Sequence, residues 1–459
     1  MNRKNAWTTY TKKQLNELDK VCKGYLKFLD KGKTERECVK EIISQAKEYG
    51  YQDLKDVIKS KKKIKAGDKI YAVWMDKTIA LFNIGKKNLQ KGINILGAHI
   101  DSPRMDVKQN PLYENGDFAY LDTHYYGGIK KYQWVALPLA LHGVVVKKDG
   151  TVIDISIGEE TDDPVFCVTD LLIHLAAEQM EKKANKVIEG ENLDILFASK
   201  PLKDKDKDAV KEGVLKLLSD KYGIEEEDFM SAEIEVVPAG PAREAGIDKS
   251  MVMAYGQDDR VCAYTSLLAM LQVDDVEKTT CCLLTDKEEI GSVGATGMQS
   301  KFFENSLAEI MNAMGEFSEL NLRRCLASSS MLSSDVNAAY DPLFASAFDK
   351  NNASYFGRGM VFCKFTGSRG KSGSNDANAE YIARIRNMMD NNNICYQTAE
   401  LGKVDVGGGG TIAYILSLYG MEVIDCGVAV LNMHAPWEIT SKADIYETLR
   451  GYKVFLKEA

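Results

Sequence analysis

The chain has 459 residues, of which 45% are hydrophobic and 27% are charged, and its formal net charge is −8. This composition predicts a globular protein with a large core, and the length favours two or three structural modules. The negative charge argues against nucleic acid or an anionic membrane as a partner.

Ten cysteines are scattered along the chain without a C-x-x-C pair, and most lie in apolar stretches. This distribution favours a reducing compartment over a disulfide framework. The N-terminal residues lack the apolar segment of a secretory signal, and no apolar run is long enough to span a membrane. We therefore expect a cytoplasmic protein.

Residues 1–104 alternate between helical and strand-like patterns. Residues 11–60 predict helices, because apolar residues recur every three or four positions beside a lysine-rich face. Residues 71–85 predict a hairpin, and residues 93–104 predict a strand. This alternation favours an α/β layer architecture.

Residues 105–245 carry a different pattern. Short β-like runs, several of them separated by Asn-Gly, Gly-Gly and Asp-Gly turn signals, predict a mainly β segment. Within it we expect a helix over 170–183, a charged solvated loop over 203–213 and a linker over 238–246.

From residue 246 to residue 459 the α/β alternation returns. We expect a helix over 259–271, a strand over 278–285 and a helix near 293–304. The simplest arrangement is one α/β domain, formed by residues 1–104 and 246–459 and interrupted by an inserted, mainly β domain.

Two adjacent acids, Glu288 and Glu289, end an apolar run. Successive side chains of a strand point to opposite faces, so the two carboxylates would not double one charge on one surface. In a tight turn, one carboxylate would bind a cation while the other transfers a proton. The alternative is a solvated turn without a function.

His99 and Asp101 lie in the sequence AHIDSP at a predicted strand end. Their spacing of two places both on one face, where Asp101 can accept a proton from the imidazole and fix the tautomer that binds metal. The alternative is a structural histidine. Asp258 and Asp259 precede an apolar helix, and N-capping explains one of these aspartates but not both.

Two further candidates complete the set. Asp335 lies in a loop of small uncharged residues, and His434 follows an apolar run near the C-terminus. Five segments thus supply two histidines and at least three carboxylates, which is the donor set of a two-metal hydrolase. Mixed histidine and carboxylate donors without cysteine suit zinc, cobalt or manganese.

The order of these motifs, HxD, DD, EEIG, DxN and a C-terminal MH, resembles the aspartyl-aminopeptidase family of dinuclear zinc metallopeptidases, in particular its bacterial probable-aminopeptidase branch. The resemblance covers nearly the whole chain, including GAHIDSPR, DLLIHLAAEQ, TDKEEIGS, VDVGGGGT and NMHAPWE. It implies a zinc-peptidase-like catalytic domain, with a central mixed sheet flanked by helices, and an inserted mainly β dimerisation domain.

The resemblance also implies two divalent metal ions per subunit, zinc by preference, held by His99, Asp258, Glu289, Asp335 and His434. Asp258 would bridge the ions. His99 and Asp335 would complete one site. Glu289 and His434 would complete the other.

Three more residues receive roles from the resemblance. Glu288 would be the general base, and Asp101 would hydrogen-bond His99. Asp259 would hold the turn around the bridging residue, after which the family often has a cis peptide bond. The expected reaction removes N-terminal residues from peptides by attack of a hydroxide that bridges the metals. The α-amine of the substrate would bind one ion.

Substrate contacts are expected from three places. Lys371 or Arg369 would accept an acidic side chain, although a surface lysine is the default interpretation. The backbone around Gly409 would line the pocket, or only form a tight turn. His174 would reach a neighbouring subunit's site, or only lie at a dimer interface. Asn337 stands where family members often carry a histidine, which leaves a substrate contact there open.

Three functions stay open at this point. The leading one is an aminopeptidase with a preference for N-terminal Asp or Glu. The second uses the same metals on neutral N-terminal residues or another amide. The third is a catalytically inactive, self-assembling scaffold or cargo protein. The family forms dimers that combine into dodecamers, so the resemblance implies a homo-oligomer with peptides as substrates and no nucleic acid or membrane partner.

Overall fold

The computed structural model describes residues 4–459. The chain divides into two compact units. The first unit comprises the chain up to Asp101, Ala242–Met433 and Glu438–Ala459, and the second comprises Ser102–Pro241 and His434–Trp437. The sequence predicts the interruption over 105–245, and it does not predict that the short segment around His434 joins the second unit.

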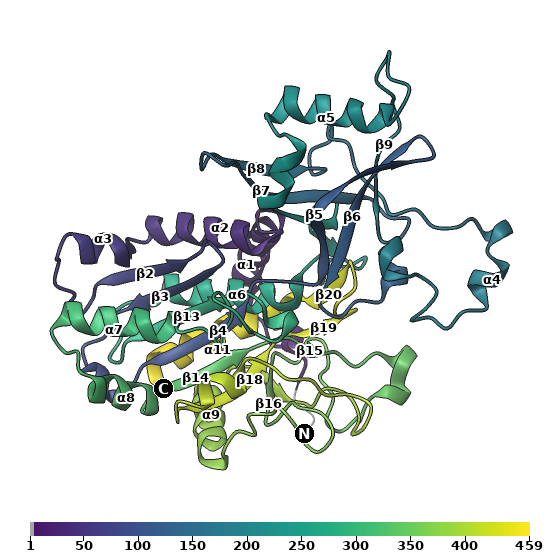
Figure 1. Ribbon diagram of the computed structural model, residues 1–459. Coiled ribbons are helices and arrows are strands. Elements are labelled where there is room, and N and C mark those ends of the chain that lie inside the picture. Colours follow the sequence, from purple (N-terminus) through teal and green to yellow (C-terminus); the bar gives the residue numbers. More distant parts are fainter. Residues whose placement is uncertain (1–3) are drawn as a thin grey trace. The chain divides into compact units, whose positions relative to one another are not determined.

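A nine-stranded mixed sheet forms the centre of the first unit (Figure 1). In spatial order its strands are β1 (Gln52–Asp53), β2 (Lys69–Trp74), β3 (Thr78–Asn83), β13 (Thr280–Thr285), β4 (Asn94–His99), β14 (Ser330–Ser334), β18 (Glu422–Gly427), β16 (Met360–Cys363) and β17 (Tyr396–Thr398). The central strands β13, β4, β14 and β18 are parallel, whereas β2 and β3 form an antiparallel hairpin.

Alternating side chains of the central strands bury two hydrophobic cores, one on each face of the sheet. On β13, Cys282 and Leu284 enter one core, and Cys281 and Leu283 enter the other. The first core is covered by α1 (Lys12–Lys31), α2 (Glu35–Glu48), α6 (Gln257–Gln272), α9 (Ala379–Asn391) and α11 (Lys442–Glu458). The second is covered by α3 (Leu54–Lys59), α7 (Phe302–Met314), α8 (Glu319–Ala327) and α10 (Ala413–Ser417).

The two N-terminal helices begin at capping boxes. Thr11 and Gln14 exchange hydrogen bonds at the start of α1, and Thr34 and Glu37 do so at the start of α2. The 3₁₀ helices of this unit are η1 (Ala6–Thr8), η2 (Leu89–Lys91), η7 (Glu288–Ile290) and η8 (Pro342–Ala347). Across residues 4–459, the helices lack the combination of length and apolar composition needed to cross a membrane.

A second, smaller sheet in the first unit supports the start of α6. Its strands are β11 (Arg243–Ala245), β12 (Met251–Ala254), β20 (Glu438–Ser441), β19 (Ala429–Leu431) and β15 (Asn337–Ala338), in that spatial order. Strand β12 leads into α6, and its last residue, Ala254, lies opposite Glu438. The C-terminal part of the chain therefore reaches the turn that carries Asp258 and Asp259.

The second unit is built on a six-stranded antiparallel sheet. In spatial order its strands are β8 (Val152–Ile157), β7 (Leu139–Val146), β10 (Ala232–Pro238), β5 (Arg104–Asn115), β6 (Phe118–Tyr126) and β9 (Ile195–Ala198). Its helical segments are η3 (Lys131–Gln133), η4 (Ile173–Leu175), α4 (Ala177–Met180), η5 (Gly190–Asn192), α5 (Ala209–Tyr222) and η6 (Glu226–Ser231). The charged loop expected over 203–213 ends early, since α5 begins inside it.

The continuous helix expected over 170–183 is wrong. This segment holds only the turn η4 and the single-turn helix α4. Its apolar side chains stay exposed, with Ile173 at 69% and Leu175 at 68%. Because a short helix is marginal without tertiary packing, the amphipathic pattern alone does not produce one here.

The helix expected near 293–304 is also wrong in position. Helix α7 begins only at Phe302, and the residues before it form turns. Gly291 and Gly294 have φ angles of 95° and 119°, a region that favours glycine over other residues. These glycines keep the chain in turns directly after Glu288 and Glu289.

Candidate metal centre

Side chains from distant segments of the first unit gather at the C-terminal edge of its central parallel strands. His99 is the last residue of β4, and Asp335 directly follows β14. Glu288 and Glu289 lie in η7, just beyond the end of β13. Because parallel strands end at a common edge, these side chains meet although they are far apart in sequence.

Their potential metal-binding atoms lie close together. His99 Nε2 lies 3.2 Å from Asp258 Oδ1 and 3.9 Å from Asp335 Oδ1. Three groups have donor atoms within 4.8 Å of one another, namely His99–Asp258–Glu289, His99–Glu288–Asp335 and Asp258–Asp259–Asp335. We refer to these six residues as the acidic cluster. The acidic cluster contains four predicted ligands, His99, Asp258, Glu289 and Asp335, together with the predicted base Glu288. Asp259 is its sixth potential metal donor.

Asp101 organises one side of the acidic cluster. His99 Nδ1 lies 3.0 Å from the Asp101 carbonyl oxygen and 3.3 Å from its carboxylate Oδ1. The Asp101 carboxylate also accepts the backbone N–H groups of Glu288 and Glu289, each at 3.1 Å. Glu288 and Glu289 thus belong to a 3₁₀ turn just after β13, in agreement with the tight turn expected for this pair. Asp101 orients the imidazole and the turn together.

The shifted pKa values of the acidic cluster indicate buried like charges that a cation would stabilise. Burial, followed by the charges of Asp258 and Glu288, raises the pKa of Asp335 well above its usual value. Burial likewise raises the pKa of Asp259. Burial alone would lower the pKa of His99, but hydrogen bonds to the neighbouring aspartates outweigh it and raise that pKa. A divalent ion relieves such buried like charges, and imidazole and carboxylate donors suit zinc.

Glu438 supports the backbone beneath this cluster. Its side chain is 1% exposed, and Oε2 accepts the backbone N–H of Asp258 at 2.9 Å. Gln257 donates from Nε2 to the Glu438 carbonyl oxygen at 2.7 Å. The peptide bond between Asp258 and Asp259 is cis, as the family resemblance implies. The sequence interpretation missed Glu438; its signal is a lone acid in the short strand after His434.

Replacing Glu438 with Ala should lower turnover and zinc affinity, each by about tenfold or more, because Asp258 loses the acceptor that fixes its backbone. Glu438→Gln should retain most of both properties, since its amide oxygen can still accept the same N–H. Metal titration and steady-state kinetics on both variants check this. Equal losses in the two variants would contradict the role of that hydrogen bond.

Two predicted site histidines belong to the second unit. His434 has its Nδ1 2.9 Å from the carbonyl oxygen of Gly128 in the same unit. His174 is exposed on η4. The predicted roles of His434 as a metal ligand and of His174 as a contact to a neighbouring subunit stay predictions.

The two segments predicted to contact substrate lie against each other. Gly367 donates its N–H to the carbonyl oxygen of Gly409 at 2.7 Å. A Cβ on Gly408 would lie 1.9 Å from the Gly367 carbonyl oxygen, so only glycine fits this contact. Lys371 is exposed and pairs with Asp376 at 3.1 Å. The glycine-rich run is therefore a packed turn that supports the Lys371 loop.

Asn337 has internal partners. Its side chain is buried, donates to Cys363 Sγ at 3.2 Å and accepts from Ser354 Oγ at 2.8 Å. These contacts account for a polar residue at this position without a substrate.

Asp425 of β18 anchors the far end of the glycine-rich run by accepting a hydrogen bond from Thr411 Oγ1. Burial raises the pKa of the Asp425 carboxyl to about 7. Because this folded-state value exceeds the unfolded value near 4, Asp425 favours folding most at low pH, and that advantage is lost as pH rises through about 7.

We therefore expect the free energy of unfolding to decrease between about pH 4 and pH 7, by at most about 4 kcal/mol from Asp425. Asp425→Asn should flatten this decrease because it removes the titrating group. Urea denaturation at a series of pH values measures both slopes. Parallel curves for the two proteins would contradict the assignment.

The helix-flanked mixed sheet, with a buried cluster of histidine and carboxylates at the ends of its parallel strands, is typical of metal-dependent hydrolases. Residues 28–456 match the family of aminopeptidase I zinc metalloproteases, M18, and the chain belongs to this family. It is therefore a zinc metallo-aminopeptidase.

Several relatives cover the chain over nearly its whole length. It is 60% identical to the probable M18 family aminopeptidase 1 of Clostridium acetobutylicum, over 99% of this chain and 98% of that one. The crystal structure of an M18 aminopeptidase from Thermotoga maritima has a TM-score of 0.95 at 45% identity and covers 100% of both chains. That of aminopeptidase I from Clostridium acetobutylicum has a TM-score of 0.91 at 58% identity, over 99% of each chain. The Ape1 dodecamer of yeast shares the fold, with a TM-score of 0.77 at 21% identity, over 96% of this chain and 97% of that one.

Proposed function

We propose that this aminopeptidase binds two zinc ions in the acidic cluster and uses Glu288 as its general base. The supporting observation is that His99 Nε2 faces both Asp258 and Asp335, at 3.2 and 3.9 Å. Asp258 suits a bridging role because it shares one donor group with Glu289 and another with Asp335. The family resemblance supplies His434 as the remaining ligand.

The reaction then follows from the side chains around the metal. Zinc, when bound, lowers the pKa of water and polarises the scissile carbonyl. Glu288 takes a proton from the attacking water and returns it to the leaving amine, a role that contributes roughly 10²–10⁴-fold in rate. The Asp101 carboxylate holds Glu288 in position by accepting the backbone N–H of Glu288. Asp101 also holds His99 in the orientation that presents Nε2 to the metal.

The proposed substrates are peptides with a free N-terminus, with Asp or Glu preferred at the first position. Lys371 and Arg369 supply cations in the loop that packs on the glycine-rich turn. An acidic side chain would replace Asp376 as the partner of Lys371. The alternative is a preference for neutral N-terminal residues. In that case Lys371 would keep Asp376 as its partner when substrate binds.

Aminoacyl-nitroanilides of Asp, Glu, Ala and Leu, each with a free and with an acetylated α-amine, test the proposal on the zinc enzyme. We expect kcat/KM for Asp and Glu to exceed the neutral values, and acetylation to abolish cleavage. Lys371→Met should lower the acidic values by about tenfold and leave the neutral ones unchanged. Cleavage of acetylated substrates would instead point to another amidase activity.

Lys350→Met is the matched control for the Lys371 variant. The Lys350 ammonium lies 5.9 Å from the ring centroid of Tyr340, and that of Lys371 lies 3.9 Å from the ring centroid of Phe365. Each variant thus removes an exposed cation from an aromatic ring. A loss of acidic preference in the control would show a general charge effect.

We also propose self-association through the second unit. Leu172, Ile173, Leu175 and Met180 are between 53% and 69% exposed within one short segment, and such concentrated apolar exposure is typical of interaction surfaces. The solved yeast Ape1 relative is described as a dodecamer. Light scattering should give a mass above one chain, and Ile173→Asp with Leu175→Asp should reduce that mass.

The cytoplasm is the proposed location. All ten cysteines are free thiols, and eight of them are buried. Free thiols persist in a reducing compartment. Cell fractionation tests this location.

A further inference from the structure

A groove of about 740 Å³ lies in the first unit, between α1, the end of α6, the end of α9 and α11. Sites for small organic ligands typically have volumes of roughly 300–1,000 Å³. The described residues that line the groove include none from the acidic cluster. The groove is thus a separate feature of the catalytic unit.

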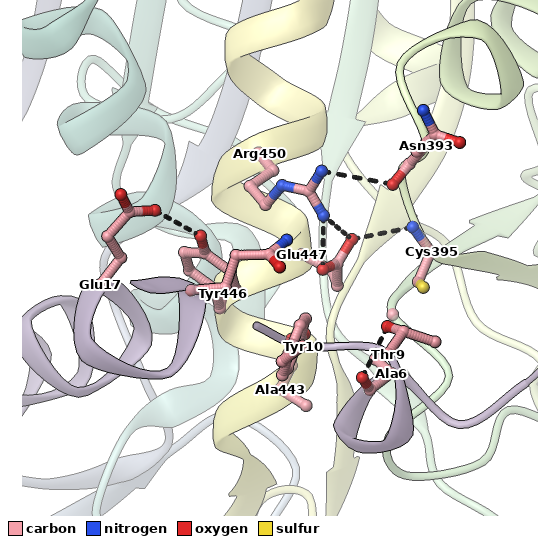
Figure 2. A network of polar contacts seen from close by, with 12 residues as sticks. Ala6, Thr9, Tyr10, Glu17, Asn393, Cys395, Ala443, Tyr446, Glu447 and Arg450 are labelled. Carbon is pink, nitrogen blue, oxygen red and sulfur yellow. Dashed lines mark hydrogen bonds and ion pairs between the residues drawn. The ribbon is translucent and has the colours of Figure 1, made fainter. Parts of the chain in front are cut away.

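The floor of this groove is apolar. Val21, Ile394 and Leu449 line it and are buried at 9%, 5% and 3% exposure, and Val454 lies beside them. Figure 2 shows α11 with the helix that carries Glu17 on one side and the loop that carries Asn393 on the other. An apolar group of a ligand can therefore contact the floor without leaving polar atoms unsatisfied.

Three lysines add positive charge to the walls. Lys453 donates to Gln272 Oε1 at 3.1 Å, and burial together with the charge of Lys457 lowers the pKa of Lys453. Lys20 and Lys457 form no ion pair within residues 4–459. Lys453 and Lys457 are four apart on α11, where like charges destabilise each other. An anion between them would relieve this repulsion.

The lining contains two acids beside four basic side chains, and each acid accepts a hydrogen bond from a neutral neighbour. Glu17 accepts a hydrogen bond from Tyr446 at 2.7 Å (Figure 2). Glu458 accepts from Asn392 at 3.0 and 3.1 Å.

Arg450 is likewise engaged, because it pairs with Glu447 at 2.7 and 2.9 Å and also donates to the Asn393 carbonyl oxygen (Figure 2). The cations left for a ligand are therefore lysine ammonium groups.

The helix dipole explains the position of only one of the three lysines. Lys457 lies in the last turn of α11, where a cation offsets the partial negative charge of the helix end. Lys20, however, lies in the middle of α1, away from either helix end. An anion in the groove would be a charge partner for Lys20, which no helix end explains.

We propose that this groove binds a small phosphate monoester with a flat apolar body. The phosphate lies among Lys20, Lys453 and Lys457, and the apolar body lies on the floor formed by Val21, Ile394 and Leu449. A phosphate suits this arrangement because lysines bind it as point charges, whereas a carboxylate is matched better by the fork of a free arginine.

The zinc enzyme is titrated with phenyl phosphate, inorganic phosphate and phenol at low salt, by calorimetry. We expect phenyl phosphate to bind more tightly than either fragment, and added salt to weaken it. The double variant Lys453→Gln, Lys457→Gln should bind phenyl phosphate about tenfold more weakly. Its peptidase kcat should be unchanged, which shows that the protein is folded and loaded with metal.

Lys55→Gln with Lys59→Gln is the matched control, since this pair has the same spacing on α3 and is exposed. It should bind phenyl phosphate like the unaltered protein. Phenyl phosphate can also bind the zinc centre, but the lysines of the groove do not affect that binding. Equal affinity in both double variants, or an affinity no greater than that of inorganic phosphate, would overturn the proposal.

Discussion

Glu288→Gln should retain zinc and lose at least about 100-fold in kcat. Glutamine keeps the size and the backbone of the η7 turn, so the N–H group that Asp101 accepts stays in place. What disappears is a carboxylate able to take a proton from water and return it to the amine. Metal analysis of the purified variant and steady-state kinetics on a free-amine substrate measure the two properties separately.

The neighbouring residue provides the contrast. Glu289→Gln should lower zinc affinity, because an amide oxygen replaces a charged donor in the group with His99 and Asp258. The two substitutions are chemically identical and one residue apart. Normal turnover in Glu288→Gln, or metal loss in that variant alone, would remove Glu288 from the role of base.

The sequence predicts those parts of the fold that local patterns determine. The hairpin expected over 71–85 is formed by β2 and β3, and the strand expected over 278–285 contains β13. The hairpin and the strand are predictable because their alternating or continuous apolar residues are the ones that the sheet buries. The segment over 170–183 is an exception, since its large apolar side chains Leu172, Ile173, Leu175 and Met180 stay exposed and the continuous helix does not form.

The sequence predicts most residues of the acidic cluster, but it does not predict the hydrogen bonds that hold them in place. His99 stands out at the end of a predicted strand, Asp258 before an apolar helix and Asp335 in a loop of small uncharged residues. The fold then places the side chains of Asp258 and Asp335 beside His99 Nε2. The hydrogen bond from Asp258 to Glu438 joins residues that are 180 positions apart. No local pattern encodes such a contact. The sequence indicates the tight turn of Glu288 and Glu289, but it does not indicate that the Asp101 carboxylate accepts both of their backbone N–H groups.

Asp101→Asn should lower zinc affinity by about 10–100-fold and reduce kcat with it. The carboxylate of Asp101 accepts the N–H groups of Glu288 and Glu289, one on each oxygen, and lies 3.3 Å from His99 Nδ1. An asparagine has one acceptor oxygen, so its amide N–H₂ must face one of these backbone donors. The turn and the imidazole therefore lose a common support.

Asp444→Asn separates this effect from a simple loss of buried hydrogen bonds. The Asp444 carboxyl group on α11 is fully buried and also accepts backbone N–H groups, including those of Gly357 and Gly359 at 2.9 and 2.7 Å. Both asparagine variants should lose about 1–3 kcal/mol of unfolding free energy. Zinc titration should then distinguish them, with weaker binding only in Asp101→Asn. Both variants lose a buried carboxylate that accepts backbone N–H groups. Equal zinc affinities in Asp101→Asn and Asp444→Asn would therefore mean that Asp101 stabilises the fold without orienting the metal centre.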